Sequence, residues 1–253
     1  MLKKRVIPTL LYMDGRLVKG VNFTNFRETG LPQSAIRIYS SQDADEVLLI
    51  NINANEFSIS EFDRLVELAA EECIMPLTIG GGIGTTQRIS SLLRKGADKV
   101  LLNSSVYNNY GLIQESAEEF GSQAITVGID FRFLNNEIQI LSHRATKVEP
   151  ISFLRHAIQI QKYGAGELLL TSVSNDGTMR GYDLGVLDQL RNELSIPIVI
   201  SGGAGNFNHL AEALNHKMVS GVACASLFHF GDNNPIRARS YLKNQGILMR
   251  NLK

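Results

Sequence analysis

Short apolar runs alternate with amphipathic stretches along the whole chain, a pattern typical of a parallel sheet covered by helices. The apolar runs predict eight strands, at 5–11, 46–52, 75–79, 98–103, 125–130, 167–172, 197–201 and 219–225. The amphipathic stretches predict helices near 31–43, 58–73, 86–95, 110–120, 151–163, 184–193, 206–215 and 235–245. Strict alternation of eight strands with eight helices favours a closed (β/α)8 TIM barrel over an open doubly wound sheet.

The chain repeats itself at a fixed offset. ADEVLLINI at 44–52 matches AGELLLTSV at 165–173, and IMPLTIGGGIG at 74–84 matches SIPIVISGGAG at 195–205, so that both segments recur 121 residues later. The barrel is therefore expected to consist of two similar halves, about 1–122 and 123–253. A length of 253 residues is typical of one such barrel, and we expect a single domain.

Glycine clusters follow two equivalent strands, at 80–82 in the first half and at Gly202-Gly203 in the second. Each of the next strands ends in hydroxyl side chains, at Ser104-Ser105 and at Ser226. Backbone N–H groups at such glycines can approach an anion closely, and a following helix N-terminus adds positive charge. Either cluster alone is equally consistent with a tight turn. Together they suit a ligand with a phosphate at each end.

Composition narrows the classes of partner. Lys+Arg and Asp+Glu both number 25, so no basic field is present to hold nucleic acid or an anionic membrane. No apolar run approaches the roughly 18 residues needed to span a bilayer. Cys73 and Cys224 are too few for a disulfide framework, which favours a reducing cytoplasm. None of the five histidines has metal-ligand spacing, and the sequence indicates neither a metal nor a cofactor.

Several motifs together resemble the cyclase subunit of imidazole glycerol phosphate synthase from end to end: RVIPTLLYMDGRLVKGVNF, PLTIGGGI, GADKVLLNSS, GAGELLLTSVSNDGTMRGYDL, PIVISGGAGN and ASLFHFG. That family works with a glutaminase subunit, whose ammonia passes through the barrel to a bis-phosphorylated ribosyl substrate. The resemblance implies a catalytic Asp130 and a Lys19 on a mobile loop over the mouth. It further implies ligand or phosphate binding by Gly82, Asn103, Ser104, Thr171, Asp176, Gly177, Gly202, Gly203 and Ser226.

Charged residues lie at the opposite ends of four predicted strands: Arg5, Glu46, Lys99 and Glu167. For a generic barrel they would be solvated strand ends, since charged side chains are rarely buried unpaired. In this chain they match the family's ionic gate at the ammonia entrance. Asp98 matches a residue that faces the glutaminase in that family.

One of the family's two acid–base aspartates is absent. Leu11 stands at the end of the first strand, and Asn51 replaces a polar residue, usually aspartate, at the end of the second. Leucine cannot transfer a proton, and losing one positioned acid or base typically costs about 10²–10⁴-fold in rate. Asp14 lies three residues beyond Leu11 and would replace it only if the loop refolded.

Three functions are consistent with these residues. The first is an ammonia-channelling subunit that works with a glutaminase in the amidation of a surface-polysaccharide or flagellin sugar, which Leu11 and Asn51 favour. The second is a histidine-pathway cyclase, which Asp130 and the two glycine clusters favour. The third is a non-catalytic scaffold that activates a glutaminase.

Overall fold

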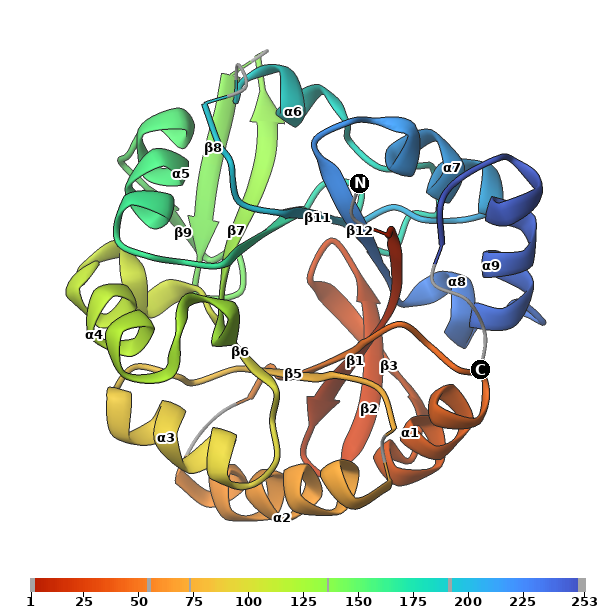
Figure 1. Ribbon diagram of the computed structural model, residues 1–253, viewed down its shortest axis with the longest axis horizontal. Helices are drawn as coiled ribbons and strands as arrows, with labels where there is room; N and C mark the ends of the chain where they lie inside the picture. Colours follow the sequence, from red (N-terminus) through yellow and green to blue (C-terminus); the bar gives the residue numbers. More distant parts are fainter. Residues whose placement is uncertain (1–2, 54–55, 73, 136, 191–192, 250–253) are drawn as a thin grey trace.

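Eight parallel strands close into a barrel in the computed structural model, which describes residues 3–53, 56–72, 74–135, 137–190 and 193–249. Pairing of β1 with β12 and of β7 with β10 completes the circle, and helices surround it (Figure 1). The predicted (β/α)8 barrel is confirmed. The barrel strands are β1 Arg5–Met13, β4 Val47–Asn51, β5 Leu77–Gly80, β6 Lys99–Leu102, β7 Ile125–Leu134, β10 Glu167–Ser172, β11 Ile198–Ser201 and β12 Val219–Cys224.

The helices bury one apolar side against the outside of the barrel, as their amphipathic sequences predict. The α-helices are α1 Pro32–Ser41, α2 Glu56–Glu72, α3 Thr86–Arg94, α4 Gly111–Phe120, α5 Phe153–Lys162, α6 Gly185–Asp188, α7 Phe207–Asn215, α8 Ser226–His229 and α9 Pro235–Asn244, and the 3-10 helices are η1 Ser104–Tyr107 and η2 Ser122–Ala124. No helix in these described ranges combines the length and apolar character needed to cross a bilayer.

The predicted helix at 184–193 is wrong in extent, because α6 ends at Asp188. It begins at Gly185, a poor helix former, and Leu184 in the N-cap position makes no side-chain cap. Residue 73 and residues 191–192, which belong to predicted helices, lie outside the described residues.

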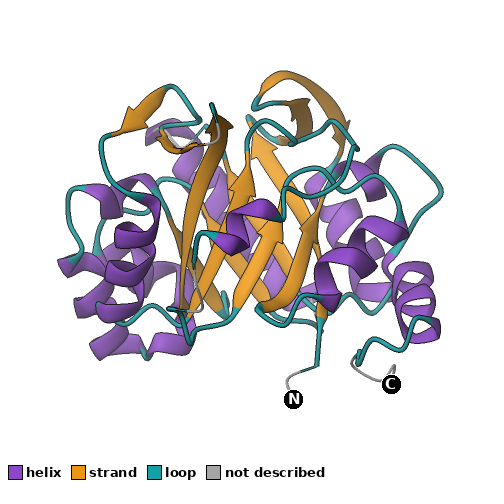
Figure 2. Cartoon of the chain, turned by 90° about the horizontal axis from the view of Figure 1, so that it is seen from above, coloured by secondary structure: helices purple, strands orange, loops and turns teal. Residues whose placement is uncertain are grey.

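Two hairpin extensions rise above the barrel, and the sequence prediction missed both. In the first half β1 continues through β2 (Arg16–Val21) into β3 (Thr24–Gly30), and in the second half β7 continues through β8 (Glu137–Ser142) into β9 (Lys147–Glu149). Figure 2 shows these extensions at the end of the barrel opposite the two chain termini. They surround the carboxyl ends of the strands, where a barrel of this type places its site.

The internal repeat is visible in the backbone. Gly81 and Gly202, 121 residues apart, both have positive φ, 101° and 88°. A Cβ at Gly81 would collide with the carbonyl oxygen of Asn51, and one at Gly202 would lie 2.5 Å from that of Ser172, the residue equivalent to Asn51. The two glycine clusters therefore make the same close turn against the same neighbouring strand.

Candidate functional site

The inward side chains of the barrel form three successive layers, because side chains alternate between the two faces of a strand. At the amino ends lies a layer of charges: Arg5, Glu46, Lys99 and Glu167. Two residues further along the same strands lie Ile7, Leu48, Leu101 and Leu169, which pack with Val199 and Ala223 as a separate apolar cluster. Two residues beyond these lie the cavity-lining side chains Thr9, Ile50, Asn103 and Thr171.

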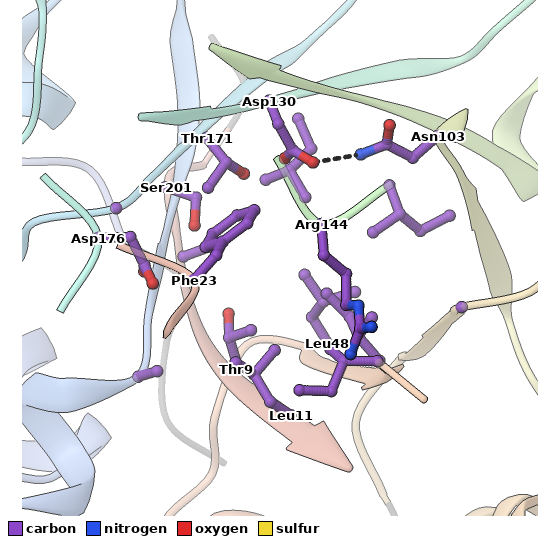
Figure 3. Close-up of a pocket in the computed structure, with 18 of the residues that line it drawn as sticks. Thr9, Leu11, Phe23, Leu48, Asn103, Asp130, Arg144, Thr171, Asp176 and Ser201 are labelled. Carbon is purple, nitrogen blue, oxygen red and sulfur yellow. Dashed lines mark hydrogen bonds between the residues drawn. The ribbon is translucent and has the colours of Figure 1, made fainter. Parts of the chain in front are cut away.

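A cavity of about 460 Å³ opens at the carboxyl ends of the strands. Both hairpin extensions contribute to its walls, through Lys19, Phe23 and Phe26 from one and His143 and Arg144 from the other. Of the residues expected to bind ligand, the following line it: Lys19, Gly82, Asn103, Ser104, Asp130, Thr171, Asp176, Gly177, Gly202, Gly203 and Ser226. Figure 3 shows the labelled side chains converging on this space.

The two halves of the cavity differ in chemistry at equivalent positions. Asp130 pairs in register with Thr171, and Leu11 pairs in register with Ile50. Because Thr171 is the repeat of Ile50, Leu11 occupies in the first half the place that Asp130 occupies in the second. One half therefore presents a carboxylate beside a hydroxyl, and the other presents two aliphatic side chains.

Asp130 is the candidate acid–base group of the cavity. Its Oδ2 accepts a hydrogen bond from Asn103 Nδ2 at 2.9 Å. Burial raises the pKa of Asp130 to about 7, although the Asn103 hydrogen bond opposes this shift, and the negative charge of Asp176 adds to it. A carboxyl group with such a pKa exchanges its proton readily near neutral pH.

Lys19 lies in strand β2 and is only 2% exposed, whereas the family resemblance implied a mobile loop over the mouth. Its Nζ donates to Asp176 Oδ2 at 2.5 Å. Burial raises the pKa of Asp176, against the attraction of the Lys19 charge. The hairpin is also bound to the loop after β10, since Asn22 N donates to the Asp176 carbonyl at 2.8 Å. Lys19 and Asp176 thus neutralise each other beside the cavity.

The two expected phosphate sites present backbone turns and hydroxyl groups. Gly82 and Gly203 have φ of 66° and 115°, conformations that residues with a Cβ rarely adopt. Ser104 Oγ accepts a hydrogen bond from His143 N at 3.0 Å. Ser226 Oγ and Asn103 Oδ1 are buried and have no partner among the described residues. Buried polar atoms of this kind are suited to bind a ligand or water.

The charges at the amino ends form a closed cycle of ion pairs, which we call the ionic ring (Arg5, Glu46, Lys99 and Glu167). Arg5 donates to Glu46 at 2.7 Å and to Glu167, while Lys99 Nζ lies 2.9 Å from Glu46 Oε2 and 3.0 Å from Glu167 Oε2. The carboxylate side chains are only 4% and 8% exposed. Burial raises the pKa of Glu167, but hydrogen bonds and charges from Arg5 and Lys99 outweigh it and hold that pKa below its ordinary value. Four charged side chains that were only solvated at the strand ends would not form such a closed cycle of ion pairs.

Of the three remaining candidates, Asn51 lines the cavity, whereas Asp98 and Asp14 lie outside both the cavity and the ionic ring. Asp98 is exposed, and its Oδ2 accepts a hydrogen bond from Leu77 N at 2.8 Å. Asp14 accepts hydrogen bonds from Asn53 Nδ2 at 3.0 and 3.3 Å and does not line the cavity. Asn51 is buried, and its Oδ1 accepts from Asn53 N at 3.0 Å. The described residues contain no group of three or more His, Cys, Asp or Glu side chains suited to a metal ion.

Sequence reasoning missed several residues of the cavity, among them Thr9, Phe23, Arg144 and Ser201. Thr9 and Ser201 carry a usable signal, because they precede Leu11 and Gly202 on inward positions of recognised strands. Phe23 and Arg144 reach the cavity only through the hairpin extensions. His156, considered structural, is buried, with its ring stacked on Tyr107 at 4.6 Å and its Nδ1 2.6 Å from the Tyr110 hydroxyl oxygen.

We predict that Lys99→Met lowers the free energy of unfolding by about 3 kcal/mol, because it leaves the two buried carboxylates with Arg5 alone. Lys95→Met is the matched control: Lys95 pairs with the half-exposed Glu67 on the protein surface, and its loss should cost less than about 1 kcal/mol. Denaturant unfolding measures both. Equal free energies of unfolding for the two variants would show that water, rather than Lys99, stabilises the charges of Glu46 and Glu167.

We predict that the Asp130 carboxyl carbon titrates in NMR with a pKa of about 7. Because the pKa of Asp130 is higher in the folded than in the unfolded state, the protonated carboxyl adds to the free energy of unfolding. This contribution is complete below about pH 4 and is lost as the pH rises towards 7. Asp130→Asn should therefore flatten the pH dependence of stability in that window. An Asp130 pKa near 4, with no such flattening, would contradict the proposed enclosure of this group.

The carboxyl-end cavity, the half-barrel repeat and the paired glycine turns agree with a comparison of the chain against known protein families. A family model described as "Histidine biosynthesis protein" matches residues 5–234. This range includes all eight barrel strands and both hairpin extensions. Members of this family are barrel isomerases and cyclases of histidine biosynthesis. The chain belongs to the histidine biosynthesis protein family.

Proposed function

We propose that the protein is an ammonia-channelling synthase subunit. It receives ammonia from a glutaminase subunit at the amino end of the barrel and releases it at the carboxyl-end cavity for amidation of a surface-polysaccharide or flagellin sugar. The observation that carries this proposal is the ionic ring, which closes one end of the barrel directly below an apolar layer. A structural barrel has no need for four charges at that depth, and burying them is costly unless they are paired.

The apolar layer supports passage of neutral ammonia rather than ammonium. Leu48, Leu101 and Leu169 are at most 6% exposed and separate the ionic ring from the cavity. A charged ammonium ion would lose its hydration there without gaining a partner, whereas neutral ammonia loses far less. In this proposal the ring opens transiently, so that ammonia enters from the glutaminase and not from solvent.

At the cavity the chain offers one proton-exchanging group. Asp130, with a pKa of about 7, can accept a proton from an attacking nitrogen or return one to a leaving oxygen. The cyclase reaction requires two positioned carboxylates in the related family, and Leu11 and Ile50 fill the second place here. This difference favours delivery of ammonia over cyclisation. Asp98, exposed at the amino end, is proposed to face the glutaminase.

The second candidate function is the histidine-pathway cyclase itself. Asp130 and the two matching glycine turns favour it, since both halves offer the same backbone turn to a ligand with two phosphates. The third hypothesis is a scaffold that only activates a glutaminase. Such a protein would need the ionic ring but no catalytic groups in the cavity. The following two experiments separate the three.

For the cyclase reading, the chain is given an ammonium salt and the bis-phosphorylated ribosyl substrate. We predict turnover at least about 10²-fold slower than that of a two-aspartate cyclase, and a gain of about tenfold or more in Leu11→Asp. Leu11→Asn is the control, since it has the same size as the aspartate but transfers no proton. Parent turnover equal to that of a two-aspartate enzyme would refute the amidation proposal.

For the channel, the ratio of glutamine-dependent to ammonium-dependent product is measured in the reconstituted complex with the glutaminase. Lys99→Ala should lower this ratio severalfold, because ammonia escapes at a distorted entrance while ammonia from solvent reaches the cavity directly. Lys95→Ala, on the outer surface, should leave it unchanged. A ratio unaffected by Lys99→Ala would remove the main support for channelling, and glutaminase activation without any product would favour the scaffold.

A further inference from the structure

Arg144 enters the cavity from the turn between β8 and β9. Three successive residues of this turn, His143, Arg144 and Ala145, have φ of 51°, 57° and 62°, a left-handed conformation that residues with a Cβ seldom adopt. Hydrogen bonds hold the turn in place, from His143 N to Ser104 Oγ at 3.0 Å and from Thr146 Oγ1 to the His143 carbonyl at 2.7 Å. The unfavourable backbone conformation is therefore maintained by contacts that direct one arginine inwards.

The guanidinium of Arg144 has no hydrogen-bond or ion-pair partner among the described residues. Lys19, the other cation that lines the cavity, is already neutralised by Asp176 at 2.5 Å. Figure 3 shows Arg144 pointing away from Asp130 and towards the side of the cavity formed by Leu11 and Leu48. The cavity consequently carries an uncompensated positive charge on its first-half side, where Leu11 supplies no negative charge.

Ser104 lies in the same part of the cavity and can donate a hydrogen bond. Its oxygen accepts the His143 N–H, so that its own hydroxyl hydrogen remains available. Gly82, which also lines the cavity, has φ of 66° and presents backbone close to the same space. Phosphate oxygens are bound by guanidinium groups, hydroxyl donors and accessible backbone N–H groups. Among the described residues that line it, the opposite side of the cavity has no such unpaired lysine or arginine, and it holds Asp130 and the Lys19–Asp176 ion pair.

We propose that Arg144 binds the phosphate group of a phosphate monoester together with Ser104, and so makes the first-half side of the cavity the preferred site for the charged end of the ligand. The two phosphate sites are then unequal, despite the internal repeat. This inference uses the proposed function only in placing the ligand in the same cavity. Binding of phosphate depends on neither the glutaminase nor ammonia.

The test measures binding of inorganic phosphate to the full chain by 31P NMR at pH 8. Arg144→Gln should weaken binding about tenfold, the loss expected for a charge-assisted hydrogen bond, and Arg144→Lys should retain part of the affinity. Arg155→Gln is the control, because Arg155 on α5 is exposed like Arg144 and carries the same charge but does not line the cavity. Thermal unfolding of each variant shows whether the fold is retained.

Double substitutions show which serine binds the same phosphate as Arg144. The losses from Arg144→Gln and Ser104→Ala should be less than additive, whereas those from Arg144→Gln and Ser226→Ala should add, because only Ser104 shares the bound phosphate with Arg144. Unchanged affinity in Arg144→Gln, or an equal loss in Arg155→Gln, overturns the inference while leaving the channel proposal intact. Absence of phosphate binding by the parent chain overturns it as well. The Lys99 experiment decides the channel independently in every case.

Discussion

Closure of the eight parallel strands is the constraint on which the rest of the structure depends. Once β1 pairs with β12 and β7 with β10, every second side chain of a barrel strand must point into the enclosed interior of the barrel. Charges can lie there only as a mutually paired set, and Arg5, Glu46, Lys99 and Glu167 meet that condition. The same alternation then places an apolar layer above the charges and the cavity above that layer. The ionic ring, the apolar layer and the cavity thus follow from one geometric rule applied to four strands.

The internal repeat gives the cavity two equivalent halves, and the chain uses them differently. Gly81 and Gly202 make the same turn against equivalent neighbouring residues, so the backbone of the two halves is symmetric at this point. The side chains are not symmetric, since Asp130 in one half corresponds to Leu11 in the other. Asp130 and the Lys19–Asp176 ion pair lie on one side of the cavity, and Arg144, which has no ion-pair partner among the described residues, points to the other. Symmetric backbone with asymmetric side chains suits a ligand whose two ends differ.

The sequence predicted the barrel strands because each is a continuous apolar run. The four ring positions stood out as charges at strand starts, but only the family resemblance indicated that they form an ionic gate. It could not predict the pairing distances, which depend on strand stagger around the closed barrel. The first hairpin was missed because β3 is mostly exposed and polar, so that no apolar periodicity marks it. The loop position of Lys19 was an implication of the family resemblance and not of any local pattern. Arg144 was missed for a related reason, since nothing local indicates three left-handed residues without a glycine.

The central claim is that nitrogen travels through the barrel, from the ionic ring to the cavity, without mixing with solvent. The most direct measurement is an isotope competition in a complex reconstituted from this chain, the proposed glutaminase and the proposed sugar-amidating enzyme. Glutamine carrying 15N in its side-chain amide is supplied together with a large excess of unlabelled ammonium. The account predicts a product that carries mainly 15N. A product whose 15N content equals that of the ammonia in bulk solution would contradict it.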